Sequence, residues 1–335
     1  MFPSAPPNLS QTELSQVQDL LERLQTSAAQ SAKAQSRKQR LVRSTRIHTA
    51  FDLEVTSWRC EEQHYYRHPS LLPTQARGLF TAPSVGIVAR GYDKFFSVDE
   101  TTRTQWSSLI RHTRGPYSLT VKENGCIILV SAPTPDDLLV LSKHAAADHA
   151  ARGDLWLGRH LAQAGRERHD LARLLHTQGL TAVFELCDDE FEEHVLPYPP
   201  DDRGLYLHGV NRNVPWLDTW GQDKVQDLGR SFGFHLVAYH TYPSLEQAKA
   251  FMDEVQHSGG VHGGRAIEGW VVRCGWTEEG EESKDFFFKV SQTKEYLEWC
   301  TQRMQDHPEW FTEYTHKRGI IHVQEQYIAW RREQG

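Results

Sequence analysis

Residues 118–130 read Ser-Leu-Thr-Val-Lys-Glu-Asn-Gly-Cys-Ile-Ile-Leu-Val and place Lys122 between two apolar stretches. The aliphatic and β-branched residues on either side predict two strands, and Asn124 and Gly125 are typical of a turn between them. We expect this strand–turn–strand unit to hold Lys122 at the mouth of a sheet pocket. Gly125 would let the backbone approach a ligand, and Asn124 would bond a ribose hydroxyl or fix the turn.

This lysine motif is weak by itself, because similar strings arise by chance and an ordinary hairpin turn is the alternative. Other charged residues stand around it in a definite order. Arg77 and Lys94 precede it, and Glu185 follows in the predicted strand Val-Phe-Glu-Leu. Glu268 then opens Glu-Gly-Trp-Val-Val-Arg, and Lys289 ends Phe-Phe-Phe-Lys. Each residue alone could be a surface charge at a strand end, but the ordered combination favours a site.

The ordered set suits adenylyl transfer, in which a lysine amine attacks the α-phosphate of ATP and expels pyrophosphate. The amine has to be unprotonated, which burial or neighbouring cations favour. We expect Lys289 to contact the α-phosphate, because cations stabilise charge on phosphate oxygens. Glu185 and Glu268 would hold hydrated Mg²⁺ or the ribose, since Mg²⁺ needs only one or two carboxylates.

The order of these residues resembles the covalent nucleotidyltransferases, which include nucleic-acid ligases and mRNA capping enzymes. It is most similar to the adenylyltransferase (ligase) domain of fungal-type tRNA ligases, which are related to phage tRNA-repair RNA ligases. The resemblance runs from about 40 to 305. The segments that carry it are Ala-Arg-Gly-Leu-Phe (76–80), Ala-Arg-Gly-Tyr-Asp-Lys-Phe-Phe (89–96), Lys-Glu-Asn-Gly-Cys-Ile-Ile (122–128), Leu-Ser-Lys-His (141–144), Glu-Leu-Cys-Asp-Asp-Glu-Phe-Glu-Glu-His (185–194) and Gly-Leu-Tyr-Leu-His-Gly-Val-Asn (204–211).

The resemblance implies an RNA ligase that works in tRNA splicing or RNA repair. Its lysine takes AMP from ATP, the AMP passes to an RNA 5′-phosphate, and an RNA 3′-OH then attacks and releases AMP. The catalytic residues that it implies are Lys122, Glu185, Glu268 and Lys289, with Mg²⁺ on the two glutamates. The nucleotide-binding residues that it implies are Arg77, Lys94, Asn124, Gly125, Lys143, Tyr206 and Gly269.

Fungal tRNA ligases also require a 2′-phosphate at the 3′-OH end, and the resemblance assigns its recognition to His149 and Arg303. Ordinary surface helix residues are the alternative for both. The chain departs from the family pattern at Ser291, where a second lysine is usual, at Cys300, where an arginine is usual, and at Glu295, where a proline is usual. Lys294 lies nearby, but its spacing does not suit the same strand face.

These departures leave a second reading open, a pseudo-ligase that binds RNA ends with little catalysis. A third reading, a capping guanylyltransferase, predicts a preference for GTP over ATP, and the residue 185–194 segment speaks against it. We find neither a kinase phosphate loop nor a pair of phosphodiesterase histidine motifs in the 335 residues. The end-healing activities that accompany the family's ligase domain are therefore expected on separate or missing domains.

Short apolar runs and helical patterns that do not alternate strictly predict an α+β fold, with antiparallel sheets flanked by helices. We expect helices over 11–33, 146–178, 222–232 and 244–257 and again after Thr293, and β structure over 47–58. Further strands are expected at 86–89, 119–121, 126–131, 138–142, 182–186, 205–210, 236–239, 270–273 and 286–290. The expected domains are an N-terminal extension (1–70), an adenylyltransferase domain (71–304) and a helical C-terminal segment (305–335).

Composition adds three expectations. The formal net charge is −7, but Lys33, Arg37, Lys38, Arg40, Arg43 and Arg46 form a basic stretch that could meet RNA phosphates; a solvated helix end is the alternative. The five cysteines are widely spaced, which favours a reduced compartment. The sequence shows neither a signal peptide nor a membrane span, so we expect the protein in the cytoplasm or nucleus. We also expect it to be a monomer.

Overall fold

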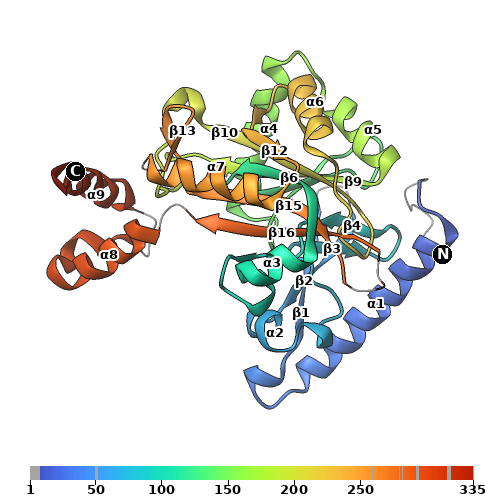
Figure 1. Ribbon diagram of the computed structural model, residues 1–335. Helices are drawn as coiled ribbons and strands as arrows, with labels where there is room; N and C mark the ends of the chain where they lie inside the picture. Colours follow the sequence, from blue (N-terminus) through green and yellow to red (C-terminus); the bar gives the residue numbers. More distant parts are fainter. Residues whose placement is uncertain are drawn as a thin grey trace. The chain divides into compact units, whose positions relative to one another are not determined.

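The computed structural model describes residues 8–49, 52–258, 260–278, 280, 282–291, 294–314 and 318–334, and Figure 1 labels most of their helices and strands. The chain divides into two compact units. Unit 1 comprises residues 1–94, 126–184 and 207–236, and unit 2 comprises residues 95–125, 185–206 and 237–335. The domain divisions after residues 70 and 304 stay predictions.

Unit 1 begins with the long helix α1 (Gln11–Ala32), as predicted. Ser10 and Glu13 form a capping box at its start, in which each side chain accepts a backbone N–H of the other residue. The helix buries an apolar face and packs beside a four-stranded sheet. The strands of this sheet, in order, are β1 (Val42–His48), β2 (Glu54–Cys60), β3 (Leu79–Ala82) and β4 (Gly86–Arg90).

A five-stranded sheet with the order β11-β10-β9-β7-β8 lies mainly in unit 1. Its strands are β7 (Cys126–Ser131), β8 (Leu139–Ser142), β9 (Leu180–Cys187), β10 (Gly204–Arg212) and β11 (His235–Leu236). The helices of this part are α4 (Asp148–Gln163), α5 (Arg168–Gln178) and α6 (Gln222–Phe232). The helical pattern predicted over 146–178 forms two helices, because the chain turns at Gly165, whose φ is +63°.

Unit 2 contains a second five-stranded sheet with the order β12-β6-β15-β16-β5. Its strands are β5 (Phe96–Ser97), β6 (Thr113–Val121), β12 (Tyr239–Tyr242), β15 (Gly269–Trp276) and β16 (Lys284–Ser291). The central strand β15 pairs antiparallel with both β6 and β16. This register sets Trp270 opposite Val121, so the end of β6 and the start of β15 meet.

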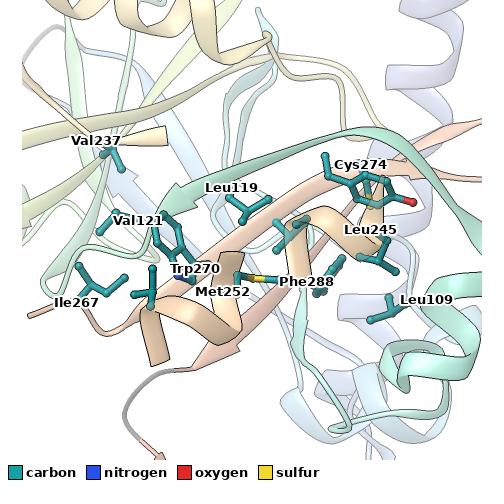
Figure 2. Packing of buried hydrophobic residues seen from close by; sticks show 14 of the residues in the cluster. Leu109, Leu119, Val121, Val237, Leu245, Met252, Ile267, Trp270, Cys274 and Phe288 are labelled. Atoms are coloured by element: carbon teal, nitrogen blue, oxygen red, sulfur yellow. The ribbon is translucent and has the colours of Figure 1, made fainter. Parts of the chain in front are cut away.

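The core of unit 2 forms between this sheet and α7 (Leu245–His257), which Figure 2 shows lying across the strands. Leu245 and Met252 of the helix pack with Leu119, Trp270 and Phe288 of the sheet. Burying a side chain of this size stabilises the fold by about 1.5–3 kcal/mol. The packing therefore fixes β6, which leads into Lys122, and β15, which begins directly after Glu268.

The C-terminal part of unit 2 is helical, as predicted, and consists of α8 (Lys294–Asp306), a 3₁₀ turn (Pro308–Phe311) and α9 (Ile320–Gln334). An aromatic cluster joins these helices through Tyr296, Trp299, Cys300, Phe311, Val323 and Tyr327. Glu193 accepts the backbone N–H groups of Ile320 and Ile321 at 3.0 and 3.4 Å. A carboxylate at this position favours the helix, because the first turn carries unpaired N–H groups and partial positive charge.

Several elements differ from the sequence predictions. The strand predicted over 236–239 is wrong, because β11 and β12 belong to different sheets. Lys289 does not end its strand, since β16 continues to Ser291. Short elements without a clear period were missed: β3, β5, α2 (Glu62–Arg67), α3 (Trp106–His112), β13 (Val261–His262), β14 (Arg265–Ala266) and the 3₁₀ turns Arg37–Gln39, Pro69–Leu71, Thr102–Thr104 and Pro200–Asp202.

Candidate active site

Lys122 directly follows β6, and its amine makes an ion pair with the carboxylate of Glu268. Both side chains are partly exposed, at 31% for the lysine and 22% for the glutamate. The backbone N–H of Lys122 donates to the carbonyl oxygen of Gly269 at 2.9 Å. Because Glu268 immediately precedes β15, the pairing of β15 with β6 brings these two charges together.

The two residues after Glu123 shape the rest of the turn. The side-chain amide of Asn124 donates to Oε2 of Glu268 at 2.6 Å, so amine and amide share one carboxylate oxygen. A Cβ added at Gly125 would lie 2.2 Å from the carbonyl oxygen of Leu186 and 3.1 Å from Cγ of Glu185. Glycine is therefore required at position 125, and the side chain of Glu185 borders the turn.

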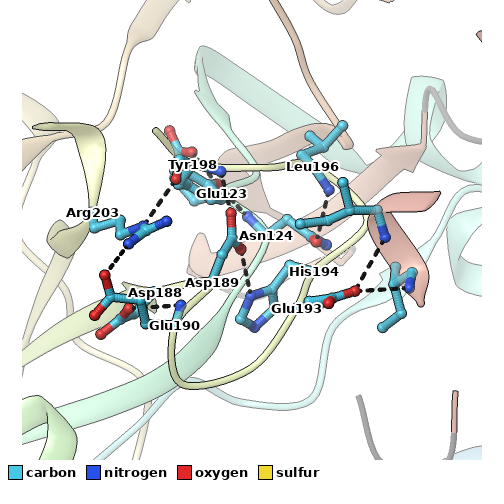
Figure 3. A network of polar contacts seen from close by, with 12 residues as sticks. Glu123, Asn124, Asp188, Asp189, Glu190, Glu193, His194, Leu196, Tyr198 and Arg203 are labelled. Carbon is cyan, nitrogen blue, oxygen red and sulfur yellow. Dashed lines mark hydrogen bonds and ion pairs between the residues drawn. The ribbon is translucent and has the colours of Figure 1, made fainter. Parts of the chain in front are cut away.

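Beneath the turn of residues 122–125 (the lysine turn) lies a buried polar network that sequence reasoning missed and that Figure 3 shows in part. Glu123 is buried, with its side chain 2% exposed, and its Oε1 accepts a hydrogen bond from Arg265. Its Oε2 accepts the hydroxyl proton of Tyr198 at 2.8 Å. The same hydroxyl accepts the backbone N–H of Asn124 at 2.9 Å. The two residues that follow Lys122 are thus tied to the protein interior.

Three further predicted residues belong to unit 2. Gly269 opens β15, where an added Cβ would lie 2.2 Å from the carbonyl oxygen of Val290. Lys289 lies inside β16 opposite Val271, and it is partly exposed. Tyr206 is buried, its hydroxyl donates to the carbonyl oxygen of Asp202 at 2.6 Å, and burial raises the pKa of this phenol.

The predicted cations of unit 1 gather around Glu62 of α2. Arg77 lies 3.3 Å and Lys94 lies 3.0 Å from its carboxylate oxygens. Burial, and after it the positive charge of Arg77, lowers the pKa of Lys143 to about 8. The structure therefore brings together three of the predicted nucleotide-binding residues, Arg77, Lys94 and Lys143, around one carboxylate.

The two residues assigned to 2′-phosphate recognition lie on helices of different units. His149 is in the first turn of α4, in unit 1. Arg303 is on α8, in unit 2, 3.3 Å from Asp306 and with its guanidinium 5.7 Å from the ring centroid of Trp299. Cys300 is buried in the aromatic cluster of this helix. The side chains of Lys294 and Glu295 lie outside the described residues.

The basic stretch at 33–46 begins at the C-cap of α1 and includes a 3₁₀ turn and most of β1, so it is more than a helix end. Arg43 lies 2.5 Å from a carboxylate oxygen of Glu61, and Arg46 lies 3.7 Å from one of Glu54. These acids, which come from β2 and the residue before α2, reduce the positive charge that the sequence suggested. The side chain of Arg37 lies outside the described residues.

Sequence reasoning missed Glu62, Glu123, Tyr198 and Arg265 because their roles depend on partners distant in the sequence. Glu123 does adjoin the lysine, but its burial depends on Arg265 and Tyr198, far along the chain. For Glu123, the only signal in the sequence was its position directly after the lysine of the motif. Glu62 lies in a helix too short to show a hydrophobic period.

The fold resembles solved ATP-dependent RNA ligases. Two archaeal ATP-dependent RNA ligase structures, described as form 1 and form 2, superpose with TM-scores of 0.56 and 0.54. They cover 93% and 91% of this chain and 73% and 72% of their own chains, at 14% and 15% identity. The predicted α+β nucleotidyltransferase fold is confirmed.

Sequence comparisons give the family. A family model described as RNA ligase matches residues 75–297, so the chain belongs to the RNA ligase family. It is 42% identical over 272 residues to tRNA ligase 1 of Schizosaccharomyces pombe and 38% identical over 271 residues to the tRNA ligase of Candida albicans. These matches cover 72% and 73% of this chain but only 34% and 32% of the relatives. The chain thus spans about a third of their length, and the predicted resemblance to fungal tRNA ligases is confirmed.

Among the described residues, no helix combines the length and the apolar character needed to cross a bilayer.

Proposed function

We propose that this chain is the adenylyltransferase module of an ATP-dependent RNA ligase, which joins RNA ends through an AMP bound covalently to Lys122. The contact between the amine of Lys122 and Oε2 of Glu268 supports this proposal most strongly. The adenylyltransferase domain would span residues 71–304, with 1–70 as an N-terminal extension and 305–335 as a helical C-terminal segment.

In the first step the Nζ of Lys122 attacks the α-phosphorus of ATP. A P–N bond forms, the P–O bond to the β-phosphate breaks, and pyrophosphate leaves with the bonding electrons. The lysine must lose a proton to attack, and Oε2 of Glu268 is in direct contact to accept it. Asn124 donates to the same oxygen and so keeps the carboxylate aimed at the amine.

The phosphates of ATP need cations to balance their charge during the transfer. We assign this role to Arg77, Lys94 and Lys143 of unit 1 and to Lys289 of unit 2. The single carboxylate of Glu62 faces both Arg77 and Lys94, so positive charge exceeds negative charge among these residues. The nucleoside part of ATP would meet Asn124, Gly125, Tyr206 and Gly269.

The site also fits a divalent cation. Glu185 borders the lysine turn and Glu268 contacts the lysine itself, and carboxylate oxygens are the donors that Mg²⁺ prefers. Bound Mg²⁺ would neutralise charge on the phosphate oxygens. We therefore assign these two glutamates as its protein ligands.

In the later steps AMP would pass to an RNA 5′-phosphate, and a 3′-OH would displace it to form the phosphodiester. We propose RNA ends from cleaved tRNA as substrates, with His149 and Arg303 reading a 2′-phosphate. Joining assays with matched RNAs that carry a 2′-phosphate or a 2′-OH test this assignment. His149→Ala and Arg303→Ala should lose the preference for the 2′-phosphate; retention of the full preference in both variants contradicts it.

We also propose that the RNA contacts the basic stretch at 33–46. The protein would act as a monomer in the cytoplasm or nucleus, together with separate kinase and phosphodiesterase activities. Such a contact would be sensitive to salt, because it releases counterions from the RNA. Charge reversal at Arg37, Lys38 and Arg40 should weaken RNA binding. Unchanged RNA binding in this variant would contradict the proposed contact.

The adenylation proposal is tested with labelled ATP or GTP, Mg²⁺ and the protein alone. We expect an acid-labile covalent label from ATP, much less label from GTP, and no label in Lys122→Ala. The acid lability identifies a P–N bond. A preference for GTP would instead point to a guanylyltransferase.

The pseudo-ligase remains a second candidate because of two residues. Ser291 and Cys300 depart from the family pattern that the sequence resembles, which has a lysine and an arginine there, and Cys300 is buried among aromatic side chains. This candidate predicts RNA-end binding without sealing. Sealing of a pre-adenylylated RNA by the wild-type protein would exclude it, whereas binding of that RNA without sealing would support it.

A further inference from the structure

We infer that Tyr198 is a positioning residue for Lys122, whose hydroxyl fixes the turn that presents the amine to Glu268. The inference rests on the proposed function, because it concerns the support of the nucleophile. Tyr198 belongs to the segment 188–203, which follows β9 and leads into β10. Neither a lysine motif nor a charge pattern marks it in the sequence.

The Tyr198 hydroxyl is used as both donor and acceptor. It donates to Oε2 of Glu123 at 2.8 Å and accepts the backbone N–H of Asn124 at 2.9 Å. These are the two residues that directly follow Lys122. Burial raises the pKa of Tyr198, so the hydroxyl keeps its proton at neutral pH and remains a donor. One oxygen atom thus ties together the side chain of one turn residue and the backbone of the next.

Glu123 makes the turn depend strongly on this hydroxyl. Its side chain is 2% exposed, and its two oxygens are bonded by Arg265 and Tyr198. A buried carboxylate that loses a hydrogen-bond donor pays a desolvation cost that water cannot offset. Without the hydroxyl, Glu123 would have to move toward solvent and would take the adjoining Lys122 with it.

Tyr198 is itself held from several sides, as Figure 3 shows. Its N–H donates to Oδ2 of Asp189 at 2.5 Å, and its carbonyl oxygen accepts from Arg203 at 3.1 Å. Its ring lies 5.7 Å from that of Tyr206, centroid to centroid. The hydroxyl therefore has a fixed position from which it can hold the turn, and its removal leaves the ring contacts in place.

The test is Tyr198→Phe in the full chain, with single-turnover labelling by ATP over a range of ATP concentrations. We expect the maximal rate of lysine adenylation to fall about tenfold, equivalent to about 1.4 kcal/mol, because the amine spends less time against Glu268. The half-saturating ATP concentration should stay within about twofold, since the hydroxyl makes no phosphate contact in this scheme. A merely structural role would not separate these two parameters.

Tyr117→Phe is the matched control. Tyr117 is also a buried tyrosine of unit 2, on the strand that leads to Lys122, but its hydroxyl bonds Thr113 at 3.0 Å. We expect this variant to label at the wild-type rate. Thermal unfolding of both variants shows whether they are folded at the assay temperature.

A second variant, Glu123→Gln, keeps the side-chain shape but weakens the bonds to Tyr198 and Arg265, and it should also slow labelling at unchanged ATP saturation. It carries the test if Tyr198→Phe does not fold. The inference is overturned if the folded Tyr198→Phe labels at the rate of wild type or of Tyr117→Phe. Failure of the proposed function looks different: wild type takes no label, or Lys122→Ala still takes it.

Discussion

The lysine turn of unit 2 and the cation cluster of unit 1 (Glu62, Arg77, Lys94 and Lys143) differ in their ratio of carboxylates to cations. In the turn, Glu268 meets the single amine of Lys122, and a neutral amide shares its oxygen. In the cluster, Glu62 meets both Arg77 and Lys94, while burial and then Arg77 lower the pKa of Lys143 to about 8. The first arrangement balances charge, and the second leaves an excess of positive charge.

This difference matches two chemical tasks. A nucleophilic amine has to give up a proton, so it needs an acceptor within contact distance. Groups that bind phosphate have to stay charged, so they need enough carboxylate to hold them in place but too little to neutralise them. We therefore expect changes in the turn to affect the rate of the covalent step, and changes in the cluster to affect ATP affinity.

The largest effect is expected for Glu268→Gln. The amide keeps the size of the side chain, but it neither accepts the lysine proton nor balances the ammonium charge. Lysine adenylation at saturating ATP should slow by about 100-fold or more, the scale of losing one preorganised electrostatic group. Glu254→Gln, an exposed position on α7, is the control. A rate near that of wild type would remove Glu268 from the proton transfer.

Arg77→Ala should change ATP affinity instead. The half-saturating ATP concentration is expected to rise about tenfold, as for the loss of one charge-assisted contact, and the maximal labelling rate should change little. Arg230→Ala removes a largely exposed arginine of the same unit, paired with Asp227 at 3.6 Å, and should leave both parameters unchanged. An Arg77 variant that loses rate at unchanged affinity would contradict the division of tasks.

Lys143 predicts a pH dependence of ATP binding. Its pKa is lowered to about 8, so the side chain is charged below that pH and loses its charge above it. ATP affinity should therefore weaken severalfold between about pH 7 and 9, and less so in Lys143→Arg, which stays charged. The protein should become more stable over the same rise, because the unfolded lysine keeps its proton up to its ordinary pKa. ATP affinity that is level across this range in wild type argues against Lys143 as a phosphate ligand.

The smallest expected effect is a gain from Ser291→Lys. Positions 289 and 291 share one face of β16, because side chains alternate along a strand. A lysine there would add a second cation beside Lys289, as the family resemblance implies for this position, and should raise sealing of adenylylated RNA severalfold. Lysine adenylation, the earlier step, should change little. Equal sealing by both proteins would show that the serine is not what limits the reaction.

Much of the fold follows from local patterns. The apolar spacing of α1, α6 and α7 and the β-rich runs of β7, β15 and β16 predicted these elements with small errors at their ends. The separation of β11 from β12 did not follow, because strand partners are chosen by long-range packing. The break at Gly165 was also missed, because glycine is tolerated inside many helical patterns.

For the candidate site, sequence reasoning named residues that the structure groups, such as Lys122 with Glu268 and Arg77 with Lys94. It did so through ordered motifs and a family resemblance. The sequence did not identify Glu62 and Tyr198, whose side chains support these groups. No local sequence feature distinguishes a buried, hydrogen-bonded side chain from an exposed one.

The role of Lys122 is tested best by locating the nucleotide after incubation of the wild-type protein with ATP and Mg²⁺. Proteolysis at a pH that preserves the P–N bond, followed by mass spectrometry, identifies the labelled side chain. We expect one AMP on the peptide that contains residues 118–130, at Lys122. An AMP on Lys143 or Lys289, or a protein that binds ATP without any covalent AMP, would contradict the assignment of the nucleophile.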